Sequence, residues 1–168
     1  MQERKLYFIK DEYFEKYECE DNKPNKHTDN SESNSRPCYY AFKEGDICWM
    51  VPISSQVSKY EGIYNKSIQK YGVCDAISFV YVKGNKNVAL IQNMIPIIDK
   101  YFDKVYTYAD SNTPIEINEN KQKEINAKVR KVLRFARQGK KLTFTPILDF
   151  EKRLKEELHN DNNKDTAN

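Results

Sequence analysis

The sequence predicts an α+β fold: a strongly twisted antiparallel β-sheet with packed helices, one of them long and basic. Short runs rich in apolar, β-branched and aromatic residues are joined by turn residues in the first part of the chain, which is typical of β-hairpins. Apolar residues recur at helical spacing later, from Ile125 to Ala136. A length of 168 residues fits one domain, which we place at residues 1–160.

The N-terminal part is predicted to begin with a strand at residues 5–9, followed by a short helix or extended edge at residues 12–17. Residues 20–35 are polar and poor in apolar side chains, so we expect a flexible loop there.

A first hairpin is predicted at residues 39–42 and 47–53, across a turn at residues 43–46. Pro52 is expected to end its second strand. The hydroxyls of Ser54 and Ser55 would then lie just past the tip of that strand.

The next stretch, residues 56–71, is rich in Tyr and Lys and is predicted to be a polar loop or a loop with one helical turn. A second hairpin is expected at residues 76–82 and 87–92, turning at Gly84 and Asn85. Residues 96–101 are read as a short helix or strand.

The clearest helix is predicted to follow Thr113 and Pro114 and to stop at Gly139. A short strand is expected at residues 142–144. Thr145 and Pro146 resemble an N-cap and first helical position, so a final helix should follow and reach about Leu158. Residues 161–168 are predicted to be a frayed tail.

Charge is distributed unevenly along the chain, although the net charge is only +3. Residues 11–35 contain eight acidic and three basic side chains. Residues 118–141 contain nine basic and two acidic ones. This segregation predicts a positive surface that suits nucleic acid.

Several classes of protein are disfavoured by what the sequence lacks. The four cysteines have no close CxxC spacing and only two histidines accompany them, so we expect reduced thiols, no metal site and no cofactor. No Gly-rich phosphate loop is present, and two histidines in polar stretches do not suggest an acid–base pair. The N-terminus lacks a signal peptide and no apolar run approaches membrane-spanning length, so we expect a cytoplasmic protein without a membrane partner.

The remaining candidate for chemistry is residues 49–59, in which an apolar strand is followed by Ser54, Ser55 and, four residues on, Lys59. Side chains at the end of a strand are held firmly yet face solvent. On the residues alone, a pair of serines after a strand is also an ordinary way to begin a loop.

The stretch Pro52-Ile53-Ser54-Ser55 resembles the Pro-Leu-Thr-Ser segment of the type III toxin family that includes ToxN, AbiQ and CptN. The resemblance covers nearly the whole chain and is closest to the CptN branch. It also includes the following segments: 5–8 with Tyr13, 70–72 with 74–75, 90–97, the basic helix ending at Gly139, and 142–145.

The resemblance implies a sequence-selective, metal-independent endoribonuclease with a compact Kid/MazF-like sheet. Such toxins process a repeated RNA precursor and are inhibited by the product, a pseudoknot RNA antitoxin, in a closed toxin–RNA assembly. When free, they cut cellular mRNA, with adenine-rich sites expected, and they halt growth or abort phage infection.

Carried over to this chain, the resemblance makes Ser54 and Ser55 the hydroxyl pair of the active site. The family lysine falls on Val57, and Lys59 is the nearest replacement. A second family lysine falls on Cys38, for which Arg36 can substitute. The N-terminal family tyrosine falls on Tyr13.

The expected chemistry is attack by the RNA 2′-hydroxyl on the adjacent phosphorus, which leaves a 2′,3′-cyclic phosphate and a 5′-hydroxyl. Ser54, Ser55 and Lys59 are the predicted catalytic residues, which would bind and neutralise the phosphate. The predicted RNA-binding residues are Tyr13, Arg36, Tyr60, Lys66, Lys70, Lys121, Lys128, Lys131 and Arg134.

Two other functions stay open at this point. The chain fits a non-catalytic RNA-binding module of the same shape, and it fits a ribonuclease toxin inhibited by an acidic protein instead of an RNA. The bland interpretation of the basic helix is a solvated face opposite an apolar stripe.

Overall fold

A computed structural model describes residues 1–18 and 36–165. The predicted flexible loop at 20–35 and residues 166–168 of the predicted tail therefore lie outside the described residues, as does Cys19.

The described residues form a seven-stranded antiparallel sheet and four α-helices, which confirms the predicted α+β class. Along the sheet the order is β4-β5-β3-β2-β1-β7, and β6 pairs with β3 off this path. The strands are β1 (Leu6–Ile9), β2 (Cys38–Glu44), β3 (Ile47–Ser54), β4 (Ser78–Val82), β5 (Asn85–Ala89), β6 (Ile95–Ile97) and β7 (Phe102–Val105).

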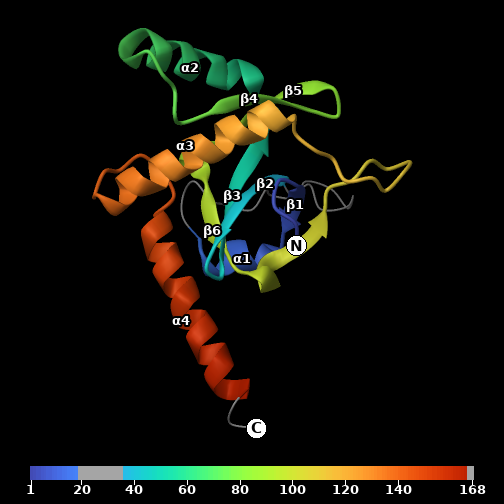
Figure 1. Ribbon diagram of the computed structural model, residues 1–168, viewed down its shortest axis with the longest axis vertical. Helices are drawn as coiled ribbons and strands as arrows, with labels where there is room; N and C mark the ends of the chain where they lie inside the picture. The colour runs from blue at the N-terminus through green and yellow to red at the C-terminus, as the bar shows by residue number, and fades with distance from the viewer. Residues whose placement is uncertain (19–35, 166–168) are drawn as a thin grey trace.

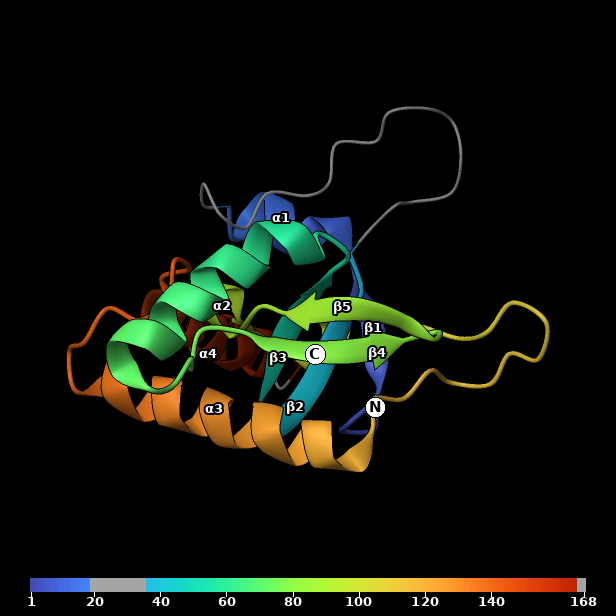
Figure 2. The ribbon, with the colours of Figure 1, turned by 90° about the horizontal axis from the view of Figure 1, so that it is seen from above.

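The α-helices are α1 (Asp11–Lys16), α2 (Val57–Tyr71), α3 (Glu119–Arg137) and α4 (Ile147–Asp165), and 3₁₀ turns occur at η1 (Ile91–Asn93) and η2 (Asp99–Tyr101). Helix α3 crosses the sheet and packs against β2 and β4, whereas α4 packs against β6 and then runs away from the sheet to Asp165 (Figure 1). Seen from above, α2 lies beside the β4–β5 hairpin (Figure 2). No described helix is both long and apolar enough to cross a lipid bilayer.

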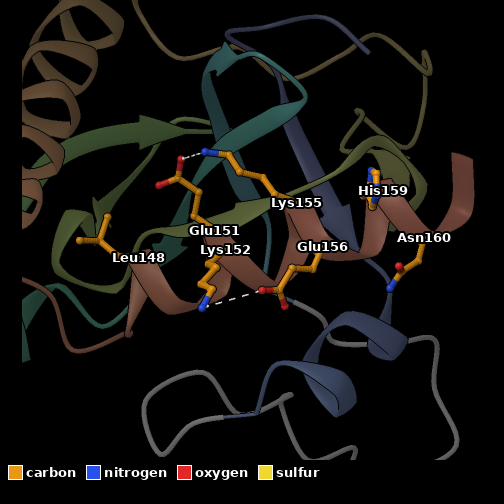
Figure 3. A pocket seen from close by; sticks show the side chains of 7 residues that line it. All are labelled: Leu148, Glu151, Lys152, Lys155, Glu156, His159 and Asn160. Atoms are coloured by element: carbon orange, nitrogen blue, oxygen red, sulfur yellow. Dashed lines mark hydrogen bonds and ion pairs between the residues drawn. The ribbon is translucent and has the colours of Figure 1, made fainter. Parts of the chain in front are cut away.

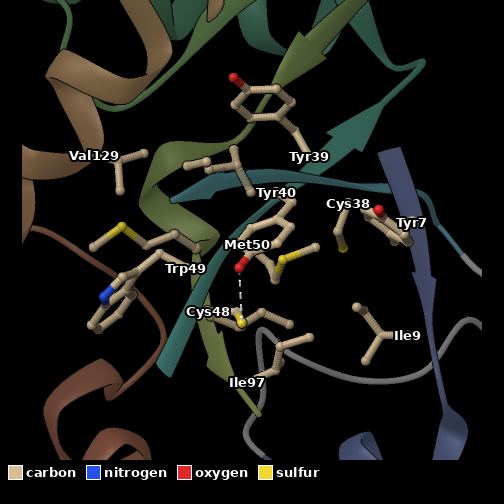
Figure 4. Close-up of a cluster of buried hydrophobic side chains, with 14 of the residues drawn as sticks. Tyr7, Ile9, Cys38, Tyr39, Tyr40, Cys48, Trp49, Met50, Ile97 and Val129 are labelled. Carbon is tan, nitrogen blue, oxygen red and sulfur yellow. Dashed lines mark hydrogen bonds between the residues drawn. The ribbon is translucent and has the colours of Figure 1, made fainter. Parts of the chain in front are cut away.

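Strand β3 lies at the centre of the hydrophobic core. All eight of its residues are buried. The strand pairs with β2 from Ile47 to Pro52, with β6 from Cys48 to Met50, and with β5 at Ile53 and Ser54. Figure 4 shows Trp49 and Met50 of this strand among the core side chains. In the same view the Cys48 thiol lies 3.2 Å from the Tyr40 hydroxyl. Burial raises the pKa of Cys48 to about 11, so this thiol stays protonated at neutral pH.

The prediction of a loop at residues 56–71 is wrong, because Val57–Tyr71 forms α2. Val57, Tyr60 and Tyr64 share one face of this helix and pack onto a small cluster that includes Ile77 and Val88. Gly72 adopts a left-handed conformation (φ +72°), and its N–H donates to the Ile68 carbonyl and ends the helix.

Other elements also differ from the predictions. Helix α3 begins at Glu119, because the Asn118 side chain caps it by accepting from the Asn120 N–H at 3.0 Å. Residues 142–144 are not a strand. Helix α4 continues past Leu158 to Asp165, so the described part of the predicted tail is helical. Strand β7 was not predicted.

Candidate functional site

The site begins where β3 ends. Ser54 is the last residue of the strand and pairs with Val88 of β5, and its side chain is almost fully buried. Its oxygen accepts a hydrogen bond from the Gln56 N–H at 3.2 Å, which fixes the turn into α2. Ser55 lies within that turn and is exposed. The strand thus delivers one firmly held and one accessible hydroxyl.

A pocket of about 790 Å³ opens at this strand end. Its walls come from the end of β3, the residues just before β2, β1, the segment after β7 and the β4–β5 hairpin, so segments distant in sequence meet here. The lining residues are Phe8, Arg36, Pro37, Ile53, Ser54, Ser55, Gln56, Val82, Lys83, Asn85, Lys86, Asn87 and Tyr106.

The pocket is positively charged. Arg36, Lys83 and Lys86 line it, and no acidic residue of the described chain does. Lys86 also forms an ion pair with Glu61 of α2 at 2.8 Å, outside the lining. Lys83 lies over the Tyr106 ring, with its Nζ 4.3 Å from the ring centroid. An electropositive recess with hydroxyl donors suits a phosphodiester.

Backbone geometry places Lys83 at the tip of the β4–β5 hairpin. Val82 pairs with Asn85, so the turn consists of Lys83 and Gly84, whose φ angles are +52° and +75°. Two positive φ values define the tight turn that matches the twist of paired strands. The predicted turn at Gly84 and Asn85 is therefore shifted by one residue, and this shift puts the lysine at the pocket.

The structure brings three of the predicted site residues together: Ser54, Ser55 and Arg36 share the pocket. Lys59 does not line it; its ammonium lies 5.5 Å from the Tyr60 ring centroid on α2. Lys83 and Lys86 were missed by the sequence analysis. The hairpin that carries them was predicted, but its pairing with β3 was not.

Two predicted RNA-binding tyrosines belong to the core instead. Tyr13 has no exposed surface, and its hydroxyl donates to the Pro96 carbonyl at 2.8 Å. Tyr60 is 8% exposed and packs in the cluster beneath α2. Neither ring can stack on an RNA base while it is buried in this way, so neither tyrosine is a candidate RNA contact.

The basic helix α3 uses much of its charge within the protein. Glu124 pairs with Lys121 at 2.7 Å and with Lys128 at 2.8 Å, and it accepts from the Ser78 hydroxyl at 2.6 Å. Burial by itself would raise the pKa of Glu124, but these hydrogen bonds lower it to about 2. Lys131 pairs with Asp75 at 2.6 Å.

Other predicted cations are more available. The guanidinium carbon of Arg134 lies 5.3 Å from the centroid of the Phe135 ring, and Arg134 has no ion-pair partner among the described side chains. Lys66 and Lys70 are exposed on α2, where Lys70 lies 5.0 Å from the Tyr71 ring centroid.

A second recess, of about 650 Å³, lies along α4 and is lined by that helix alone (Figure 3). Its cations are paired: Lys155 with Glu151 at 2.6 Å and Lys152 with Glu156 at 3.9 Å. Mixed, paired charge on one open helix face suits a polyanion less well than the first pocket does.

Comparison with known proteins bears on the fold. No family model matches the sequence, and no curated protein matches it significantly. Among solved structures the chain is similar to AbiQ, described as a lactococcal anti-phage endoribonuclease belonging to the type-III toxin–antitoxin system. The TM-score is 0.66 with 15% sequence identity, over 92% of this chain and 98% of AbiQ.

This chain has the fold of AbiQ. The match spans nearly all of both proteins, so the sheet and its helices form one architecture rather than a shared fragment. The fold expected from the sequence resemblance is thereby confirmed. At 15% identity the likeness to AbiQ concerns the fold, and the activity has to be argued from the pocket.

Proposed function

We propose that this chain is an endoribonuclease toxin of a type III toxin–antitoxin system, in the ToxN/AbiQ/CptN family. The observation that carries the proposal is the pocket in which Ser54 and Ser55 meet Arg36, Lys83 and Lys86 on an AbiQ fold. The sequence resemblance at residues 52–55 points to the same strand end.

The proposed reaction is a metal-independent transesterification. The 2′-oxygen of the RNA loses its proton and forms a bond to the adjacent phosphorus, while the bond from phosphorus to the 5′-oxygen breaks and that oxygen gains a proton. The products are a 2′,3′-cyclic phosphate and a 5′-hydroxyl. Because RNA supplies the nucleophile, the protein has to align the attack and stabilise charge on the phosphoryl oxygens.

The two serines have different parts in this scheme. Ser55 is exposed and donates its hydroxyl to a non-bridging phosphate oxygen. Ser54 is nearly buried and its oxygen already accepts from the Gln56 N–H, but its hydroxyl proton is still available as a second donor. Ser54 thereby holds the turn that presents Ser55.

The cations of the pocket neutralise the phosphate. The role predicted for Lys59, neutralising the phosphate, falls to Lys83, Lys86 and Arg36, because these residues line the pocket and Lys59 does not. No protein nucleophile or cofactor is required.

The proposed partners are RNA. A folded repeat RNA, expected to be a pseudoknot, would inhibit the toxin in a closed assembly, and cellular mRNA in the cytoplasm would be the substrate. The exposed cations Lys66, Lys70 and Arg134 are the best placed of the predicted contacts for phosphates of the antitoxin.

The decisive experiment is to incubate purified protein with RNA in the presence of a chelator and to map the ends of the products. We expect cleavage that leaves 2′,3′-cyclic phosphate and 5′-hydroxyl ends. Cleavage that needs a metal or leaves 3′-hydroxyl ends refutes the mechanism, and RNA binding without cleavage favours the non-catalytic module. An acidic reading frame beside the gene, in place of tandem non-coding repeats, favours a protein antitoxin.

A further inference from the structure

One wall of the pocket is aromatic, and the proposed cleavage chemistry leaves this wall without a role. Phe8 of β1 and Tyr106 just after β7 both line the pocket and both are half-buried, so each ring keeps an accessible part. Their centroids lie 5.1 Å apart with the planes at 69°. Each ring supports the other edge to face, which holds the pair in a fixed orientation.

We propose that Phe8 and Tyr106 form a nucleobase subsite that stacks an unpaired base next to the phosphate bound at Ser54 and Ser55. This inference rests on the proposed function and makes it more specific, because the substrate must be single-stranded at the cut. A base in a duplex is stacked on both faces and paired along one edge, so it cannot stack on these rings.

Lys83 couples the two parts of the site. Its ammonium lies 4.3 Å from the Tyr106 centroid and 5.9 Å from that of Tyr108. An exposed contact of this kind is weaker than stacking of a base on an aromatic ring. A base arriving at Tyr106 therefore displaces the ammonium, and a phosphate on the same RNA gives it a better partner in the same pocket.

Two side-chain amides, those of Asn85 and Asn87, also line the pocket. The Asn87 amide donates to the Asn85 carbonyl at 2.9 Å, and the Asn85 amide donates to the Lys83 carbonyl at 3.3 Å. Because a carbonyl only accepts, the nitrogen of each amide must face the backbone, and each side-chain oxygen is left as an acceptor. Each of these oxygens can accept from an N–H on the edge of the stacked base.

The test measures stacking directly in the full-length protein. Short single-stranded RNA oligonucleotides carry fluorescent 2-aminopurine at successive positions and a 2′-deoxy sugar that prevents cleavage. We expect quenching at the position beside the blocked sugar. Tyr106→Leu and Phe8→Leu should remove the quenching and weaken binding about tenfold, whereas Tyr106→Phe should retain both.

The matched control is Tyr81→Leu, since Tyr81 is 67% exposed on β4 and does not line the pocket. Thermal unfolding of every variant shows whether it is folded. Quenching that is absent in the wild type, or that survives in folded Tyr106→Leu and Phe8→Leu, overturns the subsite even if RNA is cleaved. Quenching lost only in those variants supports the subsite even if cleavage leaves other ends than proposed.

Discussion

Glu157 is the most heavily bonded side chain where α4 meets α1 and η2, and replacing it by glutamine is a quantitative test of the structure. The carboxylate accepts hydrogen bonds from Tyr17 at 2.6 Å and Tyr101 at 2.7 Å. It also forms ion pairs with Lys16, at 2.8 Å, and with Lys100. These partners come from α1 and η2, so the cluster ties three elements together.

The size of the effect follows from the pKa of Glu157. Burial by itself would raise this pKa, but hydrogen bonds from the two lysines and two tyrosines lower it from 4.5 to about 2. Such a difference corresponds to at most about 3.5 kcal/mol at neutral pH, at about 1.4 kcal/mol per pKa unit. Solvent screening reduces this figure because the lysines are about half exposed, and we expect about 1–2 kcal/mol.

The pH dependence has a definite sign. A carboxyl whose pKa is depressed by folding contributes its full stabilisation above the unfolded-state pKa of about 4.5, and the contribution is lost as the pH falls toward about 2. Glu157→Gln removes the charge at every pH. We therefore expect a loss of about 2–8 °C in Tm at pH 7, and a difference from wild type that shrinks between pH 4.5 and pH 3.

Urea and thermal unfolding of the wild type and Glu157→Gln, followed by circular dichroism across this pH range, measure the effect. The control is Glu156→Gln, one residue away: that side chain is 60% exposed and pairs with Lys152 at 3.9 Å, so its loss should cost under about 0.5 kcal/mol. Equal effects of the two substitutions, or a difference for Glu157→Gln that does not vary with pH, would refute the reasoning.

Three further predictions concern RNA. Ser55→Ala should lower the cleavage rate by about 10²–10³, while the exposed Ser58→Ala on α2 should leave it unchanged, as measured on a labelled oligonucleotide in chelator. Lys83→Ala should slow cleavage about tenfold or more, whereas Lys59→Ala should leave the rate unchanged. If Lys59→Ala slows cleavage and Lys83→Ala does not, the cation that acts on the phosphate is Lys59 of α2. Glu124→Gln removes the carboxylate that pairs with Lys121 and Lys128, so both lysines should become available to RNA phosphates. The slope of the logarithm of the binding constant for the repeat RNA against the logarithm of the salt concentration should then steepen by about one to two. An unchanged slope would mean that this part of α3 does not contact the RNA.

The hairpins could be predicted from sequence because their signals are local. Apolar runs separated by turn residues located β2 and β3. The prediction that Pro52 ends β3 is wrong, because Pro52 pairs with Cys38 inside the strand and β3 continues to Ser54. The prediction of α3 succeeded for the same reason, since its apolar stripe repeats over several turns.

The remaining features depend on contacts between distant segments. The sequence predicts a loop at residues 56–71, because Tyr60 is the only residue that α2 buries fully and so narrow an apolar stripe resembles a polar segment. The pairing of β5 with β3 brings Lys83 and Lys86 to the serines, and nothing near those lysines encodes the pairing. A lysine close in sequence, Lys59, was therefore preferred to lysines that are close in space.

The triple pairing of β3 has a consequence for how the protein fails under stress. Its amides and carbonyls bond to β2, β6 and β5, so the strand cannot detach without dismantling the sheet on both sides. Amide protons along β3 should exchange with deuterium only through complete opening of the molecule. Heat should consequently abolish RNA cleavage at the same temperature at which the whole chain unfolds. The remaining cleavage activity would then measure the fraction of protein that is still folded.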